Sequence, residues 1–98
     1  MADIAFAWTA AKAAANRRKH RVSFSEAQTV FYDEEALLLD DPDHSADEDR
    51  FILLGLSASL RVLLVVHSYR DQDATIRIIS ARKANARERF MYEKRRNQ

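Results

Sequence analysis

The sequence predicts an α+β protein in which a small antiparallel sheet is flanked by two N-terminal helices and one C-terminal helix. Three observations support this prediction. Alanine-rich segments with capping residues occupy the first third of the chain, apolar runs of strand length follow, and a basic segment with its own capping residues ends it. A group of strands bordered by separate helices is typical of the α+β class.

The first helix is expected from Ala10 to about His20. Alanine has the highest helix propensity, and Thr9 is a suitable N-cap. Before this helix, Phe6 and Trp8 alternate with small residues and allow a short strand at best. The residues expected on the buried stripe of the helix are Ala11, Ala14 and Ala15.

Capping signals mark the other two helices. Ser23 and Glu26 have the S-x-x-E spacing of a capping box, and apolar residues recur at helical spacing over Phe24–Phe31. Near the C-terminus, Asn85 and Glu88 have the same spacing and mark the start of the last helix. The residues expected to face the core from this helix are Ala86 and Phe90.

Four strands are expected between the second and third helices. They correspond to the apolar runs Ala36–Leu39, Phe51–Leu56, Val62–Val66 and Thr75–Ala81. The short polar connection over residues 57–60 predicts an antiparallel hairpin between the middle two.

Composition excludes several classes of protein. Ninety-eight residues with 47% hydrophobic content predict one domain over residues 1–98. The chain has no cysteine, which excludes disulfides and thiolate metal sites, and its one Gly argues against a glycine-rich phosphate loop. No apolar run reaches membrane-spanning length and no signal-peptide pattern is present. We therefore expect a cytoplasmic protein with no membrane association, metal or cofactor.

Charge is divided into blocks, although the formal net charge is only +1. Residues 12–21 carry five cations and no carboxylate, residues 23–50 carry ten carboxylates and one arginine, and residues 77–98 carry eight cations and two carboxylates. A concentrated basic surface suits a nucleic-acid backbone, and an acidic one suits a cationic partner. The alternative is that these charges only solvate a small surface.

Two blocks of the sequence resemble the BrnT family of toxins. Residues 12–20 have the pattern K-x-x-x-N-x-x-K-H, and residues 76–84 have the pattern I-R-I-I-S-A-R-x-A. The resemblance extends from about Phe6 to Tyr92. The chain differs from the family pattern at Arg21, where Gly is usual, and at Thr9, where Asp is common.

The resemblance implies a RelE-like fold and the toxin of a type II toxin–antitoxin pair. It also implies a metal-independent endoribonuclease whose partner is a ribbon-helix-helix antitoxin, in a complex of two toxins with two antitoxins. Glycine at position 21 would suit a left-handed helix C-cap, so Arg21 is expected to alter the turn between the first two helices. Thr9 remains a competent N-cap.

The candidate catalytic residues follow from the chemistry of RNA cleavage. An RNA strand is cut without metal when its 2′-OH attacks the adjacent phosphate, which requires a base, an acid and cations. Arg82 and Arg77 are the candidates for the phosphate; five positions separate them, so they face opposite sides of an ideal strand, and Arg82 is favoured. His67 and Glu88 are candidates for proton transfer, although a hydrogen-bonded core histidine and a capping-box glutamate are the alternatives.

Further RNA contacts are expected from the helices. The candidates are Lys12, Lys19, His20, Arg89 and Tyr92. His20 is equally consistent with capping its helix, and Tyr92 with covering the sheet edge. Two other functions stay open: a non-catalytic module that binds nucleic acid or protein, and a degenerate toxin that retains only antitoxin binding.

Overall fold

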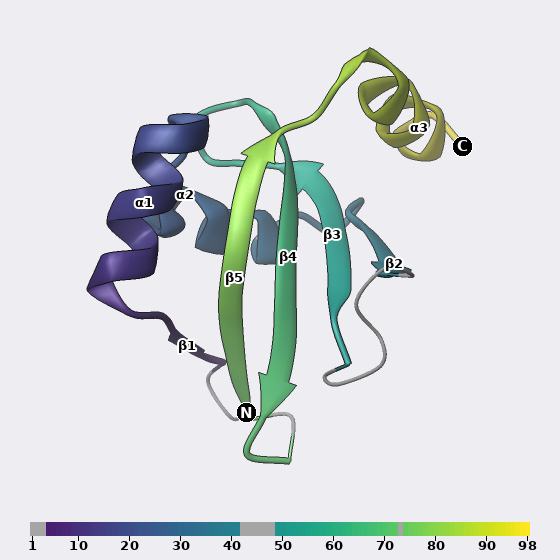
Figure 1. Cartoon of the computed structure of the whole chain (residues 1–98). Helices are drawn as coiled ribbons and strands as arrows, with labels where there is room; N and C mark the ends of the chain where they lie inside the picture. The colour runs from purple at the N-terminus through teal and green to yellow at the C-terminus, as the bar shows by residue number, and fades with distance from the viewer. Residues whose placement is uncertain (1–3, 42–48, 73) are drawn as a thin grey trace.

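The computed structural model describes residues 4–41, 49–72 and 74–98 (Figure 1). It confirms the α+β class and the predicted order of elements. No helix in these ranges has the length and apolar character needed to span a membrane. The elements are β1 (Ala5–Ala7), α1 (Ala10–His20), α2 (Phe24–Thr29), the 3₁₀ turn η1 (Val30–Tyr32), β2 (Leu37–Asp40), β3 (Phe51–Leu56), β4 (Val62–Arg70), β5 (Thr75–Lys83) and α3 (Ala86–Arg96).

The five strands form one sheet in the order β1-β5-β4-β3-β2. Strands β2 to β5 pair with their neighbours in antiparallel fashion, as predicted. Strand β1, the short strand allowed for at the N-terminus, pairs parallel with β5, with Ala5 opposite Thr75, so the sheet is mixed. The short β1 segment carries no sequence signal for its direction in the sheet.

The two faces of the sheet are covered differently (Figure 1). Helix α2 packs against one face, which we call the closed face, and α1 lies beside the β5 edge of the sheet with Ala13 against the buried cluster of the same face. Helix α3 lies over only one end of the opposite face, which we call the open face. The buried cluster of the closed face consists of Val22, Phe24, Ala27, Val30, Leu53, Leu63, Val65, Ile76, Ile78 and Ala81. The cluster of the open face consists of Leu54, Leu64, Ala84 and Tyr92.

The stripe of α1 that faces the sheet differs from the prediction. Ala11, Ala14 and Ala15 are exposed, whereas Ala13 is half-buried and Asn16 is buried. Alanine side chains bury little apolar area, so an alanine-rich helix gives no clear periodicity to decide its orientation. A polar residue decides it instead.

Asn16 attaches α1 to β5. Its Nδ2 donates to the carbonyl oxygens of Val22 (3.0 Å) and Ala81 (2.9 Å), and its Oδ1 accepts the Ala81 N–H (3.0 Å). Three hydrogen bonds satisfy this buried amide, which would otherwise destabilise the interior. Helix α1 is therefore held against the strand residue that directly precedes Arg82.

The predicted helix caps are largely present. Thr9 Oγ1 accepts the Lys12 N–H (3.2 Å), and Ser23 Oγ accepts the Glu26 N–H (3.0 Å). The carboxylate of Glu26 binds Arg61 instead of completing a capping box. The Arg61 side chain lowers the pKa of Glu26 more than burial raises it.

Arg21 adopts the conformation that glycine would take. Its φ of 58° and ψ of 34° are left-handed, and its N–H donates to the Arg17 carbonyl (2.9 Å). The left-handed C-cap is thus kept, and the predicted change in this turn is not seen. The cost is the steric strain of a β-carbon in this region.

Helix α3 is anchored by Tyr92. This side chain is 2% exposed, and its hydroxyl donates to Asp33 Oδ2 (2.6 Å), which also accepts the Leu56 N–H (2.8 Å). Burial and the Asp33 carboxylate raise the pKa of Tyr92 to about 12. Ala86 and Phe90 are exposed, so the prediction that they face the core was wrong.

Candidate functional site

A β-bulge in β5 decides where its two arginines point. The adjacent β4 residues 66 and 67 pair with Ser80 and Ile78, so Ile79 is an extra residue without a partner across the ladder. Successive side chains of a strand point to opposite faces of the sheet, and an extra residue shifts this alternation by one position. Arg77, Ser80 and Arg82 therefore lie on the same face, although a regular strand would separate the two arginines. The partner of Arg82 across the sheet is Leu64, which places this face as the open one.

Arg82 forms a two-point ion pair with Glu88. Its Nη1 donates to Glu88 Oε1 (2.8 Å) and its Nη2 to Glu88 Oε2 (2.9 Å), and Nη1 also donates to the Lys83 carbonyl (3.3 Å). The hydrogen bonds to Glu88 raise the pKa of Arg82 despite its partial burial. The guanidinium is thereby held in one orientation at the junction of β5 and α3.

Glu88 is committed to structure at both carboxylate oxygens. Besides Arg82, it accepts the Asn85 N–H (2.9 Å), while Asn85 Oδ1 accepts the Glu88 N–H (2.8 Å), so the predicted capping box is complete. The bonds from Arg82 lower the pKa of Glu88 more than burial raises it. A carboxylate held in this way is a weak proton acceptor, which favours the structural interpretation of Glu88.

Arg77 lies further along the open face and is half-buried. Its Nε donates to Ser68 Oγ (3.4 Å) on β4. The structure thus brings Arg77 and Arg82 to one surface, with Ser80 between them in the sequence.

The cations of α1 line a shallow cavity beside β5. The cavity has a volume of about 290 Å³, and its α1 residues include Lys12, Lys19 and His20. These side chains share one side of the helix because Lys12, Asn16 and Lys19 follow an i, i+4, i+7 spacing. Ser80 lines the same cavity, so it marks the point where the α1 cations and the open face meet.

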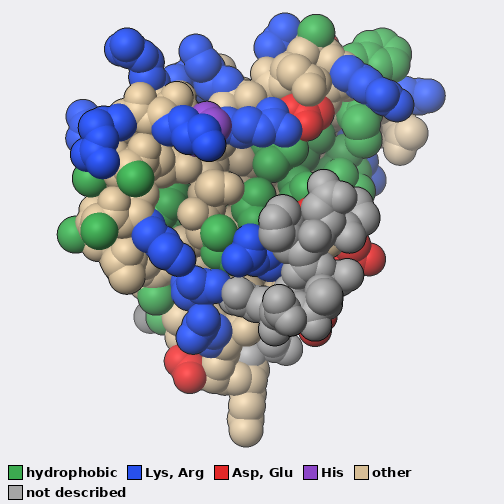
Figure 2. Space-filling model, viewed as in Figure 1, with side chains coloured by type: hydrophobic (Ala, Val, Ile, Leu, Met, Phe, Trp, Pro, Cys, Tyr) green, Lys and Arg blue, Asp and Glu red, His purple; other side chains and the backbone are tan. Residues whose placement is uncertain are grey.

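Lys and Arg side chains dominate this side of the molecule (Figure 2). They gather over α1 and the junction of β5 with α3, and a second group lies over the lower part of the sheet. Few acidic side chains are visible among the described residues on this side. Such a surface attracts phosphates, and the attraction decreases with salt concentration.

His67 is separated from this surface. It is 0% exposed, its ring contacts Phe31 at a centroid distance of 4.8 Å, and its Nε2 lies 3.2 Å from the Tyr69 hydroxyl. Burial lowers the pKa of His67, although its contact with the Val65 carbonyl opposes the shift. The ring points into the closed-face core, which favours the core-histidine alternative.

Arg89 and Tyr92 also lie apart from the α1 cations. Arg89 Nη1 donates to the Ala84 carbonyl (2.9 Å), and its side chain lines a different cleft, between α3 and the β3–β4 turn. Tyr92 is enclosed in that region of α3 and presents no ring face on which a base could stack. Its position favours the structural alternative.

A family model described as "Ribonuclease toxin, BrnT, of type II toxin-antitoxin system" matches residues 8–88. The chain belongs to the BrnT family. A comparison with curated proteins gave no match. As a BrnT-family toxin, the chain has RNA as its target class and an antitoxin as its partner class.

The match to the BrnT family includes α1, β5 and the Arg82–Glu88 pair. Sequence reasoning missed two contributors to this site, Asn16 and Ser80. Asn16 had a usable signal, since it is a polar residue midway between Lys12 and Lys19 on one helix side. The bulge that places Ser80 beside this site had no sequence signal, because Ile79 continues an unbroken strand-like pattern.

Proposed function

We propose that this toxin is a metal-independent endoribonuclease in which a 2′-OH of RNA attacks the adjacent phosphate. A 2′,3′-cyclic phosphate forms while the P–O5′ bond breaks, and the departing 5′-oxygen takes its proton from water. Arg82 and Arg77 bind the scissile phosphate, and the α1 cations bind the neighbouring backbone. The observation that supports this assignment is the bulge at Ile79, which places both arginines on the sheet face that the helices leave open.

The orientation of Arg82 suits a phosphate ligand. A guanidinium has five N–H donors, and Arg82 uses three of them, two on Glu88 and one on the Lys83 carbonyl. Glu88 occupies the edge formed by Nη1 and Nη2. No residue in the described ranges binds the edge formed by Nε and Nη2, so two donors remain there, which is the arrangement for two-point phosphate binding. Glu88 thus acts as a positioning residue for Arg82.

His20 is the proton acceptor in this proposal. An imidazole nitrogen can accept a proton, and His20 lies in the cavity that Ser80 shares with the open face. His67 is enclosed in the core and Glu88 is ion-paired, so neither side chain is as well placed.

The first test compares three proteins on a single-stranded RNA in excess chelator. We expect the unmodified chain to produce 2′,3′-cyclic phosphate ends. Arg82→Ala should lower the cleavage rate about 100- to 1,000-fold, the usual effect of removing one transition-state donor. Arg95→Ala, which removes an exposed arginine near the far end of α3, is the control and should retain most of the rate.

Three results would decide against this mechanism. Cleavage that stops in chelator contradicts metal independence. An equal loss of cleavage rate in the Arg82 and Arg95 variants would mean that Arg82 contributes only general electrostatic attraction for RNA. Salt-sensitive RNA binding without cleavage would favour the non-catalytic binding module or the degenerate toxin.

The role of His20 is tested by the cleavage rates of two variants at saturating RNA. We expect His20→Ala to lower this rate about 100-fold or more. Lys19→Ala should weaken RNA binding and leave the rate at saturating RNA nearly unchanged. An unchanged rate in the His20 variant would assign the proton transfer to another group.

The partner class supports a proposal about assembly. We propose a ribbon-helix-helix antitoxin in a complex of two toxins and two antitoxins, because proteins of that fold dimerise. Light scattering on the copurified pair measures the mass of the complex. A mass that corresponds to one toxin and one antitoxin contradicts the proposed stoichiometry.

A further inference from the structure

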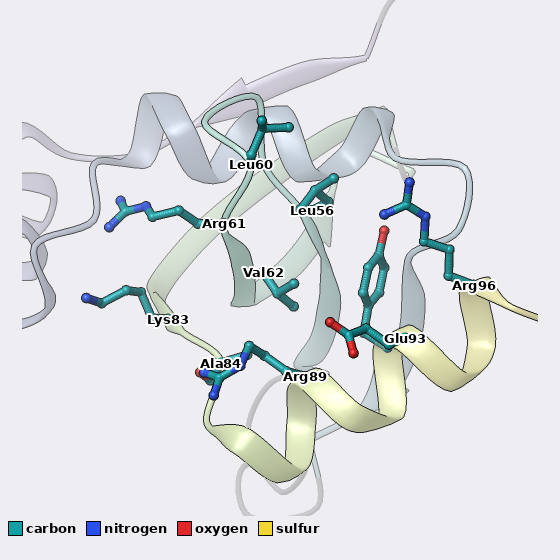
Figure 3. Close-up of a pocket in the computed structure, with 10 residues that line it drawn as sticks. Leu56, Leu60, Arg61, Val62, Lys83, Ala84, Arg89, Glu93 and Arg96 are labelled. Atoms are coloured by element: carbon teal, nitrogen blue, oxygen red, sulfur yellow. The ribbon is translucent and has the colours of Figure 1, made fainter.

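A second basic cleft lies between α3 and the turn that joins β3 to β4 (Figure 3). Its volume is about 330 Å³. It does not include Arg77, Arg82 or the cations of α1. The proposed cleavage mechanism therefore leaves its chemistry unexplained.

The apolar part of this cleft comes from the β3–β4 hairpin. Leu56, Leu60 and Val62 lie between the charged side chains in Figure 3. Leu60 is 78% exposed, the largest exposed fraction among the described large hydrophobic residues. Its φ of 63° is left-handed, a conformation that disfavours a branched apolar residue at a turn where Asn or Gly is usual. A leucine at this position is thus unfavourable for the free protein in both exposure and backbone conformation.

Cations surround this apolar part. Arg61 and Lys83 lie on one side of the cleft in Figure 3, and Arg89 and Arg96 project from α3. Lys83 makes no side-chain hydrogen bond or ion pair with any residue in the described ranges. Arg61 is paired with Glu26, so Lys83, Arg89 and Arg96 carry the charge available to a ligand.

These features favour a peptide over a nucleic acid. A strand of RNA is held by phosphate contacts and by stacking of bases on aromatic faces. The aromatic residue that lines this cleft, Tyr92, is 2% exposed, so it offers no ring face on which a base could stack. An apolar side chain flanked by carboxylates instead matches both the leucines and the surrounding cations.

We propose that this cleft binds an acidic segment of the antitoxin in which carboxylates flank an apolar side chain. The identity of the partner rests on the toxin–antitoxin function, whereas the chemistry of the segment rests on the cleft. Lys83 directly follows Arg82, and Arg89 directly follows Glu88. Two cations of the cleft are thus sequence neighbours of the ion pair that orients the phosphate-binding arginine.

The inference is tested by NMR titration of the ¹⁵N-labelled full chain. The probes are a capped peptide of alternating glutamate and leucine pairs, its lysine–leucine counterpart, and a DNA oligonucleotide that cannot be cleaved. We expect the acidic peptide to shift the amide signals of Leu60, Lys83 and Arg89. The basic peptide should leave these signals unchanged, and the oligonucleotide should shift signals of α1 and β5.

A matched pair of variants identifies the binding surface. Leu60→Asp removes the apolar contact, adds a repulsive charge and introduces a residue that tolerates a left-handed conformation. It should weaken binding of the acidic peptide by at least about tenfold. Leu38→Asp makes the same change at a leucine on β2 that is 54% exposed and outside the cleft, and should leave binding unchanged.

Several outcomes would overturn the inference. They are an acidic peptide that shifts no cleft signal, an oligonucleotide that shifts the cleft signals as strongly, and equal effects of the two leucine variants. RNA cleavage by Leu60→Asp separates this inference from the proposed function. Cleavage should continue in that variant whether or not the peptide binds, whereas the Arg82 variant tests cleavage alone.

Discussion

The closed and open faces of the sheet are built from the same strands but are filled to different extents. Ten buried hydrophobic residues form the closed-face cluster, and α1, α2 and an aromatic group around His67 cover it. The open-face cluster has four buried members, and Tyr92 is the one buried residue of α3. Arg77 and Arg82 lie on the less covered face, where a charged side chain can reach a ligand and does not have to be buried among apolar residues.

The comparison shows how stability and function are divided in a chain of 98 residues. The closed face supplies most of the apolar burial, so the open face can carry cations whose mutual repulsion destabilises the fold. Substitutions should therefore affect stability on one face and RNA cleavage or binding on the other.

The largest expected difference is between two phenylalanines. Phe24 is 1% exposed on the closed face and Phe90 is 66% exposed on α3. Phe24→Ala should lower the free energy of unfolding by about 3–5 kcal/mol, and Phe90→Ala by less than about 0.5 kcal/mol. Urea denaturation measures both values. Similar losses in the two variants would show that α3 contributes as much to stability as the closed face.

The second prediction concerns pH and the closed face. The folded pKa of His67 is lowered, so below about pH 6.5 the unfolded chain binds a proton that the folded chain does not. Stability contributed by the neutral ring is present above that pH and is lost as the pH falls toward the folded pKa. The resulting slope is at most about 1.4 kcal/mol per pH unit.

The substitution His67→Phe tests this assignment. It keeps a ring among Phe31, Phe51 and Tyr69 and should remove this part of the pH dependence. Denaturation curves between pH 7.5 and pH 5 measure the difference between the two proteins. An identical slope in both would assign the effect to another titrating group.

The third prediction concerns the attachment of α3 to the open face. Tyr92→Phe removes the hydroxyl that donates to Asp33 and should destabilise the protein by about 1 kcal/mol. Amide hydrogen exchange should accelerate in α3 and remain nearly unchanged in α1, because the two helices rest on different clusters. Uniform acceleration throughout the chain would mean that the two faces unfold together.

The smallest predicted effect is at the end of α1. Arg21→Gly relieves a left-handed φ of 58° but gives the unfolded chain more freedom, so the net stabilisation should be about 0.5 kcal/mol. Thermal denaturation measures this change in stability. Lys12→Gly, in the first turn of the same helix, is the control. It should destabilise the protein, because the backbone at Lys12 is helical and glycine has a low helix propensity.

Much of the fold could be predicted from local sequence signals. Thr9, Ser23 and Asn85 cap the three helices as expected, and the apolar runs located strands β2 to β5. Burial could not be predicted where the side chains on different sides of a helix have the same size and polarity, as do the alanines of α1. It also failed on α3, where Phe90 and Tyr92 are both aromatic and only the contact with Asp33 distinguishes them.

The candidate site was harder to predict because it depends on contacts between distant segments. Arg82 and Glu88 were identified individually, but their ion pair required the turn between β5 and α3. His67 was a reasonable candidate by residue type, and its enclosure depends on Phe31, 36 positions earlier. The shared face of Arg77 and Arg82 depends on the pairing register of β5 with β4.

The bulge in β5 makes the spacing of residues as important to the toxin as their chemistry. Five positions separate Arg77 from Arg82, and the bulge at Ile79 takes up one of them, so both side chains reach the open face. Deleting Ile79 would leave four positions in a regular strand, and both arginines would still point to the open face. Replacing Ile79 by another β-branched residue would also keep the geometry. A deletion at Ile79 should therefore be tolerated better than a single-residue insertion between positions 77 and 82, which adds a second residue without a partner in the ladder. In this strand, chain length is itself a functional property.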